Sequence, residues 1–321
     1  ICIEAKIVGC KIITNNLIGV ASEDYFKLKG RELLEFIRKN NDNVVQKMCN
    51  VIEDNNIEFA PCIDIPKVTV FCPLYNGEKY IKHFLDDMVD QTIFEKCELI
   101  IIDANSPQNE KKIIEEYSKK YKNIVYKRLD YRASVMETEN MALKMATGEY
   151  FAQCCVDDRH SKKYLEVLSK HLCLNEDVDL VYSDCLQTKK ANETFELNTS
   201  NGTLYEHSKN DFSKENMIKC LPGPMPMWKI KVHEKCGYFR EEMRFAGDWE
   251  MFLRMVKNGS KFKKIDIPMG LYYYNEDGLS TSLEHDKERK AEEASVFFEY
   301  KDIFGENNFR TYENYFRQFI K

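Results

Sequence analysis

The sequence predicts an α/β fold with a mostly parallel central sheet, because apolar runs that end in polar residues recur along it. These runs are residues 68–76, 98–106 and 148–158. Strands buried on both faces of a parallel sheet are nearly continuous in apolar residues, and a helical pattern follows each run, as in a right-handed crossover. Ligands bind in the crevice outside the carboxyl ends of such strands. We therefore expect Tyr75, Asp103, Asp157 and Asp158 to lie at one site.

The expected elements alternate at first and then become irregular. Strands are expected at 68–76, 98–102, 124–128, 150–155 and 178–182, and helices at 78–89, 110–121, 135–146 and 162–172. The helical segments carry apolar residues at three- and four-residue intervals. Residues 192–210 are polar and indicate a surface loop. Beyond them we expect a proline-rich loop at 221–228, helices at 232–236 and 248–258, and strands at 262–267 and 271–274.

The chain divides into three expected parts. A small N-terminal α/β segment covers residues 1–66, the main domain covers 67–282, and a C-terminal tail covers 283–321. The tail carries aromatic residues at helical spacing, so we expect it to pack as helices on the main domain or on a partner. Because the chain begins with Ile1 in mid-pattern, we expect it to be a segment of a longer protein.

Charge and cysteine usage exclude several classes of function. The chain has 47 Lys and Arg against 53 Asp and Glu, a formal net charge of −6, and no basic field for a nucleic-acid backbone. No apolar run is long enough to cross a membrane, and the first residues lack the order of a signal peptide. The twelve cysteines are scattered without a Cys-x-x-Cys pair, which favours buried free thiols in a reducing compartment. We expect a cytoplasmic protein without a transmembrane segment, and peripheral association with the inner face of the membrane stays open.

Three motifs together resemble the nucleotide-sugar domain of family 2 glycosyltransferases, which have the GT-A fold. They are the loop 73–76, the pair Asp157-Asp158 directly after a strand, and residues 245–254, in which a helix begins at Asp248. The resemblance covers roughly residues 67–280. It implies metal-dependent transfer of a sugar from a nucleoside diphosphate, with UDP favoured, to an acceptor hydroxyl with inversion. Such a reaction would serve glycan or cell-surface polysaccharide synthesis, with a glycan, glycolipid or glycoprotein as the acceptor.

The resemblance implies a set of donor-binding residues. Pro73 and Tyr75 belong to the first loop, and the Tyr75 ring would lie against the base of the donor. Asp103 would hydrogen-bond the base. Arg132, just before a helix, and Asp157 would also contact the donor.

The resemblance also implies a metal site. Asp158 would bind Mn²⁺ or Mg²⁺, because hard divalent cations take oxygen ligands from one or two carboxylates together with substrate phosphates. Asn275 is a further candidate ligand, at a position where relatives often have a His. The chain departs from the family pattern at Ala104 and Cys155, where many relatives have Asp. The structural alternative is that the acidic pair only caps a helix.

On the acceptor side, Asp248 would be the catalytic base. Trp249 would offer the sugar ring an apolar platform, Glu250 would bind an acceptor hydroxyl, and Trp228 would line the acceptor pocket. The structural alternatives are that Asp248 caps its helix, which is compatible with a role as the base, and that Trp228 packs in the core.

Two other functions and one further resemblance remain open. A nucleotidyltransferase could use the same acidic pair, although residues 73–77 are not a Gly-rich phosphate loop. A non-catalytic nucleotide-sugar-binding or scaffold module of a longer transferase is the second alternative. Residues 1–60 weakly resemble the end of a GT-B glycosyltransferase module, in which Glu4 would stand at a donor-ribose position.

Overall fold

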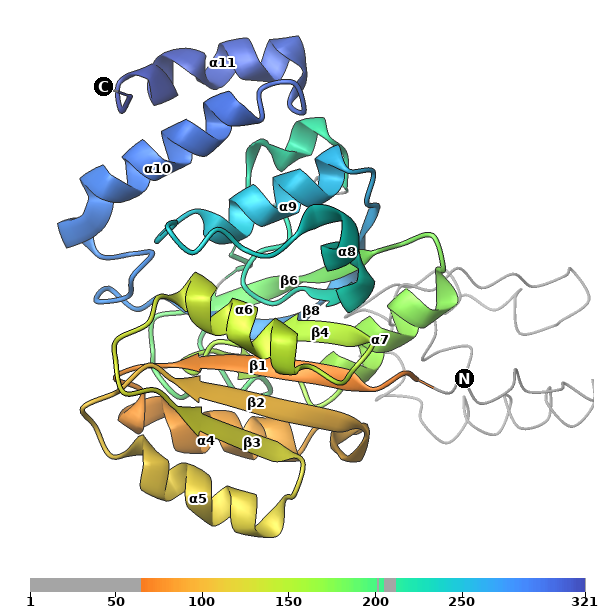
Figure 1. Ribbon diagram of the computed structural model, residues 1–321, viewed down its shortest axis with the longest axis vertical. Coiled ribbons are helices and arrows are strands. Elements are labelled where there is room, and N and C mark those ends of the chain that lie inside the picture. The colour runs from red at the N-terminus through yellow and green to blue at the C-terminus, as the bar shows by residue number, and fades with distance from the viewer. Residues whose placement is uncertain (1–64, 201, 205–211, 321) are drawn as a thin grey trace, which may run out of the picture. The chain divides into compact units, whose positions relative to one another are not determined.

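The computed structural model describes residues 65–200, 202–204 and 212–320 (Figure 1). The N-terminal segment expected at 1–66, with Glu4 and its GT-B resemblance, lies almost wholly outside the described residues, as does part of the loop expected at 192–210. Within the described residues, no helix is long and apolar enough to span a membrane.

The described part of the chain is built on one eight-stranded sheet. Its strands are β1 Val68–Leu74, β2 Cys97–Asp103, β3 Ile124–Arg128, β4 Tyr150–Gln153, β5 Arg159–His160, β6 Leu180–Thr188, β7 Met227–Lys229 and β8 Phe262–Tyr273. The strands lie in the order β3-β2-β1-β4-β7-β6-β8-β5. β1 is parallel to β2 and β4, and β2 is parallel to β3, which confirms the predicted α/β fold. β7 is antiparallel to both β4 and β6, and β5 is antiparallel to β8.

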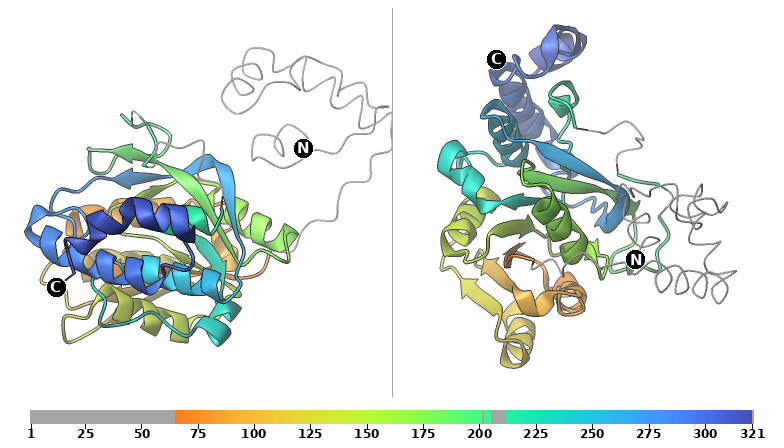
Figure 2. Two further views of the ribbon diagram at one scale, coloured as in Figure 1. Left: turned by 90° about the horizontal axis from the view of Figure 1, so that it is seen from above. Right: turned by 90° about the vertical axis from the view of Figure 1, so that its right-hand side faces the viewer.

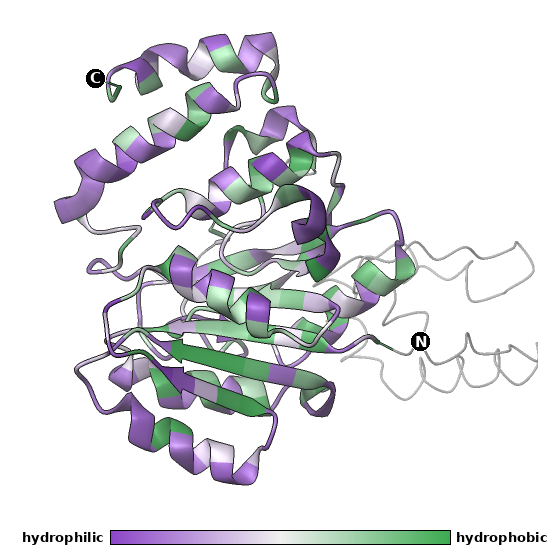
Figure 3. Cartoon of the chain, viewed as in Figure 1, coloured by the Kyte–Doolittle hydropathy of each residue, from purple (hydrophilic) through white to green (hydrophobic). Residues whose placement is uncertain are grey.

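Helices cover both faces of the parallel half of the sheet (Figures 1 and 2). The α-helices are α4 Glu78–Val89, α5 Glu110–Lys120, α6 Val135–Met145, α7 Tyr164–Leu174, α8 His233–Cys236, α9 Gly247–Lys257, α10 Asp286–Glu299 and α11 Gly305–Arg317. Short 3₁₀ turns are η3 Phe94–Lys96, η4 Glu215–Ile218, η5 Ile230–Val232 and η6 Leu283–His285. α6 packs on β1 and β2, whereas α4 and α5 pack together on the other face. Figure 3 shows a mostly hydrophobic β2 between these two layers.

The antiparallel half of the sheet differs from the expectation in two places. β7 includes the last two residues of the segment 221–228, which its prolines led us to expect as a loop, and extends to Lys229. The two strands expected at 262–267 and 271–274 form the single strand β8, although Pro268 and Gly270 would weaken a strand. Gly270 stands opposite His160 in the sheet register, and a side chain at this position would collide with the Met225 sulfur. The glycine thus allows a close approach and does not end the strand.

The C-terminal residues form two helices, as predicted for the tail. Phe297 of α10 stacks on Phe309 and Phe316 of α11, with ring centroids 5.0 and 4.3 Å apart. Trp249 of α9 lies 6.1 Å from the ring of Phe304, just before α11. Aromatic packing therefore joins the C-terminal helices to α9, in agreement with their neighbouring positions in Figure 1.

Candidate active site

A cavity of about 1030 Å³ lies at the carboxyl ends of β1 and β4, beside the starts of α6 and α9. Seven of the residues singled out in the sequence line it: Pro73, Tyr75, Arg132, Asp157, Asp158, Asp248 and Asn275. They come from segments far apart in the chain. The fold therefore brings most of the predicted donor, metal and base residues to one cavity.

Tyr75 lines this cavity and keeps 37% of its surface exposed. The Arg132 guanidinium stacks on its ring, with the guanidinium carbon 3.4 Å from the ring centroid. The loop is held by the next residue, Asn76, whose φ of 52° is left-handed and whose N–H donates to the Ser106 hydroxyl at 3.0 Å. A paired aromatic ring and guanidinium offer flat surfaces on which a nucleotide base can stack.

Asp157 and Asp158 follow β4 and form an acidic wall of the cavity. Asp158 is buried, and its Oδ1 accepts the N–H of Tyr273 at 3.0 Å. Burial, and after it the charge of Asp157, raise the pKa of Asp158 well above its usual range. Burial likewise raises the pKa of Asp157. Two neighbouring carboxylates that are poorly solvated fit a divalent cation, which would compensate their charge.

Asn275 contacts the acidic pair as a hydrogen-bond partner of Asp157, and this bond lowers the Asp157 pKa against the larger effect of burial. The Oδ1 of Asn275 accepts the N–H of Asp277 at 3.2 Å. In the described part of the chain, no group of three or more His, Cys, Asp and Glu side chains is arranged to hold a metal ion. A cation at this wall would therefore depend on the two carboxylates together with diphosphate oxygens and water, as Mg²⁺ commonly does.

Asp248, the second residue of α9, is half-buried and lines the same cavity. Its Oδ1 accepts the N–H of Trp249 at 2.7 Å, so the carboxylate also caps its own helix. The Cys220 sulfur lies 3.9 Å from Oδ2. Burial first, and then repulsion from Glu292, raise the pKa of Asp248. A carboxylate with a raised pKa is a stronger proton acceptor, which suits a general base.

Asp103 does not line the cavity, although its neighbour Ala104 does. It is fully buried, and its carboxylate accepts hydrogen bonds from the Ser106 N–H at 2.7 Å, the Tyr126 hydroxyl at 2.6 Å and the Arg128 guanidinium at 2.6 Å. Two of these partners belong to β3, and Arg128 stands opposite Asp103 in the register. This placement does not support the expected base contact. Asp103 instead fixes the loop that follows β2.

The two tryptophans expected at the acceptor pocket are core residues outside the cavity lining. Trp228 is 1% exposed, and its Nε1 donates to Nε2 of His233 at 3.0 Å. Trp249 is 6% exposed, and its Nε1 donates to the Met217 carbonyl at 2.8 Å. Their polar atoms are thus satisfied inside the core. The packing alternative describes Trp228, and Trp249, for which no such alternative was considered, packs in the core as well.

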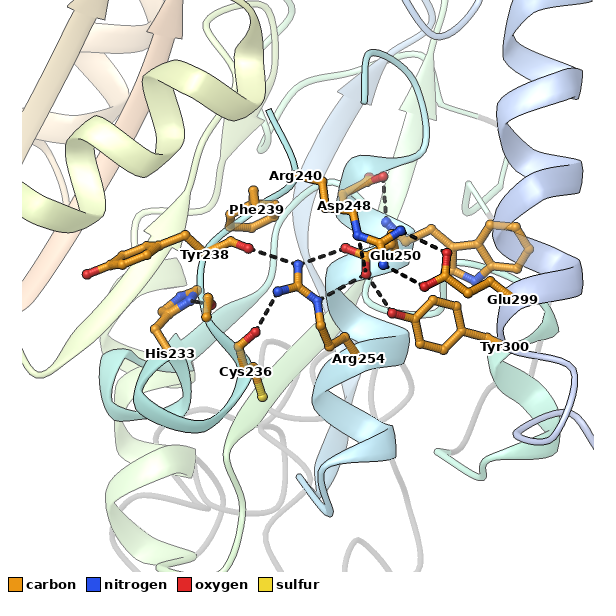
Figure 4. Close-up of polar contacts among 12 residues, drawn as sticks. His233, Cys236, Tyr238, Phe239, Arg240, Asp248, Glu250, Arg254, Glu299 and Tyr300 are labelled. Atoms are coloured by element: carbon orange, nitrogen blue, oxygen red, sulfur yellow. Dashed lines mark hydrogen bonds and ion pairs between the residues drawn. The ribbon is translucent and has the colours of Figure 1, made fainter. Parts of the chain in front are cut away.

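Glu250 is also buried outside the cavity lining, in the ion-pair network of Figure 4. Its carboxylate oxygens accept from Arg254 at 3.0 and 2.8 Å and from the Tyr300 hydroxyl at 2.6 Å. Nε of Arg240 lies 3.4 Å from Oε1 of Glu250. Glu250 and Arg254 stand four residues apart on one helix, a spacing that predicts an ion pair. The four-residue spacing could therefore have identified Arg254 as a partner of Glu250. The contact with Tyr300 could not be identified in this way, because Tyr300 is distant in sequence.

Two further contributors were missed in the sequence. Residues 277–282, 284 and 285, between β8 and α10, line the cavity. Glu292 of α10 binds main-chain N–H groups just before α9. Neither role has a local signal in the sequence. The loop is polar with one glycine, Glu292 has the pattern of a surface residue, and both roles depend on how the C-terminal helices pack.

The fold and this cavity define a glycosyltransferase, and comparison with known proteins agrees. The chain belongs to glycosyl transferase family 2, whose model matches residues 69–237, just over half of the chain. It is 27% identical over 205 residues to an uncharacterized glycosyltransferase of Methanocaldococcus jannaschii. This match covers 64% of this chain and 69% of that protein. It is 28% identical over 220 residues to a chondroitin synthase of Pasteurella multocida, which covers 67% of this chain but only 21% of the synthase.

Solved structures share the fold. The Staphylococcus aureus protein TarS (residues 1–349), in complex with UDP-GlcNAc, matches with a TM-score of 0.61 at 19% identity, over 77% of this chain and 73% of that one. A mannosyltransferase of Pyrobaculum calidifontis, in complex with GDP-Man and Mn²⁺, matches with a TM-score of 0.55 at 18% identity, over 76% of this chain and 65% of that one.

Proposed function

We propose that this protein transfers a sugar from a nucleoside diphosphate, UDP in particular, to an acceptor hydroxyl with inversion and with a bound divalent metal ion. The observation that supports this most directly is that one cavity is lined by the acidic pair and by Asp248. A diphosphate held at the pair and a hydroxyl held at Asp248 would flank one anomeric carbon. In-line attack from the side of the base then inverts the configuration.

The donor would be held by the first loop. Pro73 and Tyr75 line the cavity, and Arg132 stacks on Tyr75, so the base would lie against this flat pair. The complex of TarS with UDP-GlcNAc, on the same fold, supports a uridine nucleotide. The Pyrobaculum mannosyltransferase was solved with GDP-Man, so both nucleotides belong in a binding test.

The metal ion would be held by Asp158, with Asp157 beside it. The Tyr273 N–H fixes the Asp158 carboxylate, and Asn275 fixes that of Asp157. A bound Mn²⁺ or Mg²⁺ supplies charge stabilisation of the departing diphosphate, worth several kcal/mol. The Mn²⁺ in the Pyrobaculum structure supports this part of the proposal.

Asp248 would take the proton of the attacking hydroxyl. The Trp249 N–H orients Oδ1, and the substrate would bind at Oδ2, which has only the long contact of 3.9 Å with the Cys220 thiol. The similarity to a chondroitin synthase supports an acceptor that is a growing polysaccharide or another glycan. The chain spans about a fifth of that synthase, so the acceptor is proposed as a class and not as a particular polymer.

The test is the variant Asp248→Asn, because the amide keeps the size and capping ability of the side chain but cannot accept a proton at neutral pH. UDP- and GDP-sugars would be offered with Mn²⁺, with p-nitrophenyl glycosides and water as acceptors. We expect donor affinity to stay nearly unchanged and transfer to fall by about 10²-fold or more. Near wild-type transfer by Asp248→Asn would overturn the assignment of the base. Donor binding without transfer or hydrolysis by the wild-type chain would favour the non-catalytic module.

A further inference from the structure

One face of α10 holds the segment 237–246, which joins α8 to α9 and leads directly to the proposed base. Oε1 of Glu292 accepts the backbone N–H groups of Arg244, Phe245 and Ala246 at 3.1, 2.7 and 2.6 Å. Oε2 accepts the Arg244 N–H at 3.0 Å. Three successive N–H groups that converge on one carboxylate form charge-assisted hydrogen bonds, which are among the strong ones in proteins.

These contacts hold the main chain just before α9. Ala246, the residue before α9, makes no side-chain cap, whereas Ser, Thr, Asp or Asn would normally provide one. The next residue, Gly247, packs closely on α6, since an added Cβ would lie 2.5 Å from the Met136 sulfur. The backbone just before Asp248 is therefore held from two sides, by α6 and by Glu292.

The other end of the segment is fixed independently of Glu292. Asn140 of α6 donates to the Phe239 carbonyl at 2.9 Å and accepts the Phe239 N–H at 2.9 Å. Arg254 of α9 donates to the Tyr238 carbonyl at 2.9 Å (Figure 4). Loss of the Glu292 carboxylate would thus release residues 244–246 while the start of the segment stays in place.

We propose that Glu292 is a positioning residue for sugar transfer, which fixes the main chain of residues 244–246 and so directs the Asp248 carboxylate toward the acceptor. This inference rests on the proposed function, in which Asp248 is the base. Glu292 does not line the cavity, so it acts through Asp248 and not on the substrate. It also lies beyond residues 69–237, the part that matches the family model.

The charge of Glu292 gives the inference a second consequence. Repulsion from Glu292 adds to burial in raising the pKa of Asp248. Among the described residues, Glu139 of α6, Glu293 of α10 and the Cys220 thiol also interact with Asp248. Burial first, and repulsion from Asp248 as a smaller cause, raise the pKa values of both glutamates. A base must be deprotonated, so activity falls as pH drops through the Asp248 pKa. Neutralising Glu292 should lower that pKa and move the acid limb of the rate profile to lower pH.

The experiment compares Glu292→Ala and Glu292→Gln in the full chain, with the sugar donor and p-nitrophenyl glycoside on which the wild type is active. Because a small misplacement of a catalytic group can cost about 10²-fold, we expect Glu292→Ala to lower kcat by about 10-fold or more. UDP affinity with Mn²⁺, measured by calorimetry, should stay within about two-fold, since the donor side of the cavity is untouched. Glu292→Gln keeps Oε1 as an acceptor for the same three N–H groups, so kcat should recover to within about three-fold of wild type.

Glu288→Ala is the matched control. Glu288 lies one turn earlier on the same face of α10, with a side chain 66% exposed, and its carboxylate is 3.5 Å from the Arg244 guanidinium. It accepts none of the three N–H groups. We expect this variant to keep the wild-type kcat and acid limb, whereas Glu292→Gln shifts the limb to lower pH.

The outcomes separate this inference from the proposed function. If Asp248→Asn is inactive but Glu292→Ala turns over at the wild-type rate, the positioning role is wrong and the base stands. An equal loss of kcat and melting temperature in Glu292→Ala and Glu292→Gln would also overturn it, because it indicates a general structural defect. If Glu292→Ala does not fold, an unshifted acid limb in Glu292→Gln decides against the inference. If Asp248→Asn is fully active, the base assignment itself fails.

Discussion

The guanidinium carbon of Arg132 lies 3.4 Å from the centroid of the Tyr75 ring, within the cavity that also contains the acidic pair. A guanidinium over an aromatic face is attracted by the charge distribution of the ring. The stack joins the loop after β1 to the segment before α6. It presents a flat surface at the end of the cavity proposed for the nucleotide base.

We predict that Tyr75→Ala weakens UDP binding by about 10-fold, since stacking of a base on an aromatic side chain is worth ~1–3 kcal/mol. Tyr75→Phe keeps the ring and should bind UDP nearly as well as the wild type. Calorimetric titration of UDP with Mn²⁺ measures the difference.

Tyr312→Ala is the control for Tyr75→Ala, because Tyr312 on α11 has the same exposed fraction, 37%, and does not line the cavity. Its UDP affinity should match the wild type. Equal affinities for Tyr75→Ala and Tyr312→Ala would show that the base does not stack on Tyr75.

A second prediction concerns the metal ion. Asp158→Asn should abolish the dependence of UDP affinity on Mn²⁺, because an amide oxygen is a weaker ligand than a carboxylate for a hard cation. The amide oxygen can still accept the Tyr273 N–H, so the melting temperature should be retained. Asp90→Asn, which removes an exposed carboxylate paired with Lys162, should leave the Mn²⁺ dependence intact. Wild-type protein that binds UDP equally with Mn²⁺ and with EDTA would contradict the metal assignment.

The parallel half of the fold could be predicted because its patterns are local. α4 and β3 begin and end at the predicted residues, 78–89 and 124–128. The loops after β1 and β4 were expected to meet, and both line the cavity, since the carboxyl ends of parallel strands share one edge of a sheet. The antiparallel partners β7 and β5 are only three and two residues long, too short for a periodic signal.

The roles of Asp103, Trp249 and Glu250 could not be predicted in the same way, because their partners are distant in sequence. The buried carboxylate of Asp103 is satisfied by side chains of β3, which depends on strand register. Trp249 and Glu250 are covered by the C-terminal helices. A tryptophan at a helix start has the same sequence pattern whether a sugar or another helix covers its ring.

A third prediction distinguishes these two situations for Trp249. Trp249→Ala should destabilise the fold by about 3–5 kcal/mol, as expected for truncation of a buried aromatic residue. For a chain of this size the melting temperature should fall by roughly 10 °C. The KM for the acceptor, measured at a temperature where the variant is folded, should be unchanged.

Tyr238→Ala, which truncates an aromatic residue that is 44% exposed, serves as the control and should melt close to the wild type. A Trp249→Ala protein with the wild-type melting temperature and a raised acceptor KM would instead place the ring against the sugar.

The fourth prediction concerns Glu139, a buried carboxyl group on α6. It is fully buried, and within the described residues neither of its oxygens has a hydrogen-bond partner. Burial, and after it the charge of Asp248, raise the Glu139 pKa well above the usual value of 4.5. Folding therefore takes up a proton at this site when the pH lies between the unfolded and the folded pKa. The stability that a raised pKa contributes is complete below the unfolded pKa and is lost as pH rises through the folded pKa.

The side chain introduced in Glu139→Gln is neutral at every pH. The variant should therefore not lose stability at this site as the pH rises. At pH 4, below the unfolded pKa, the variant and the wild type should melt at similar temperatures, whereas at pH 8 the variant should melt higher by about 2 °C or more. Glu137→Gln, two residues earlier on the same helix, is the control, because the Glu137 carboxylate is already bonded to the Tyr131 hydroxyl at 2.5 Å and is not fully buried. It should follow the wild-type pH dependence. Calorimetric scans of the three proteins at both pH values provide the measurement, and a Glu139→Gln protein that melts below the wild type at pH 8 would mean that the carboxylate has a compensating partner in solution.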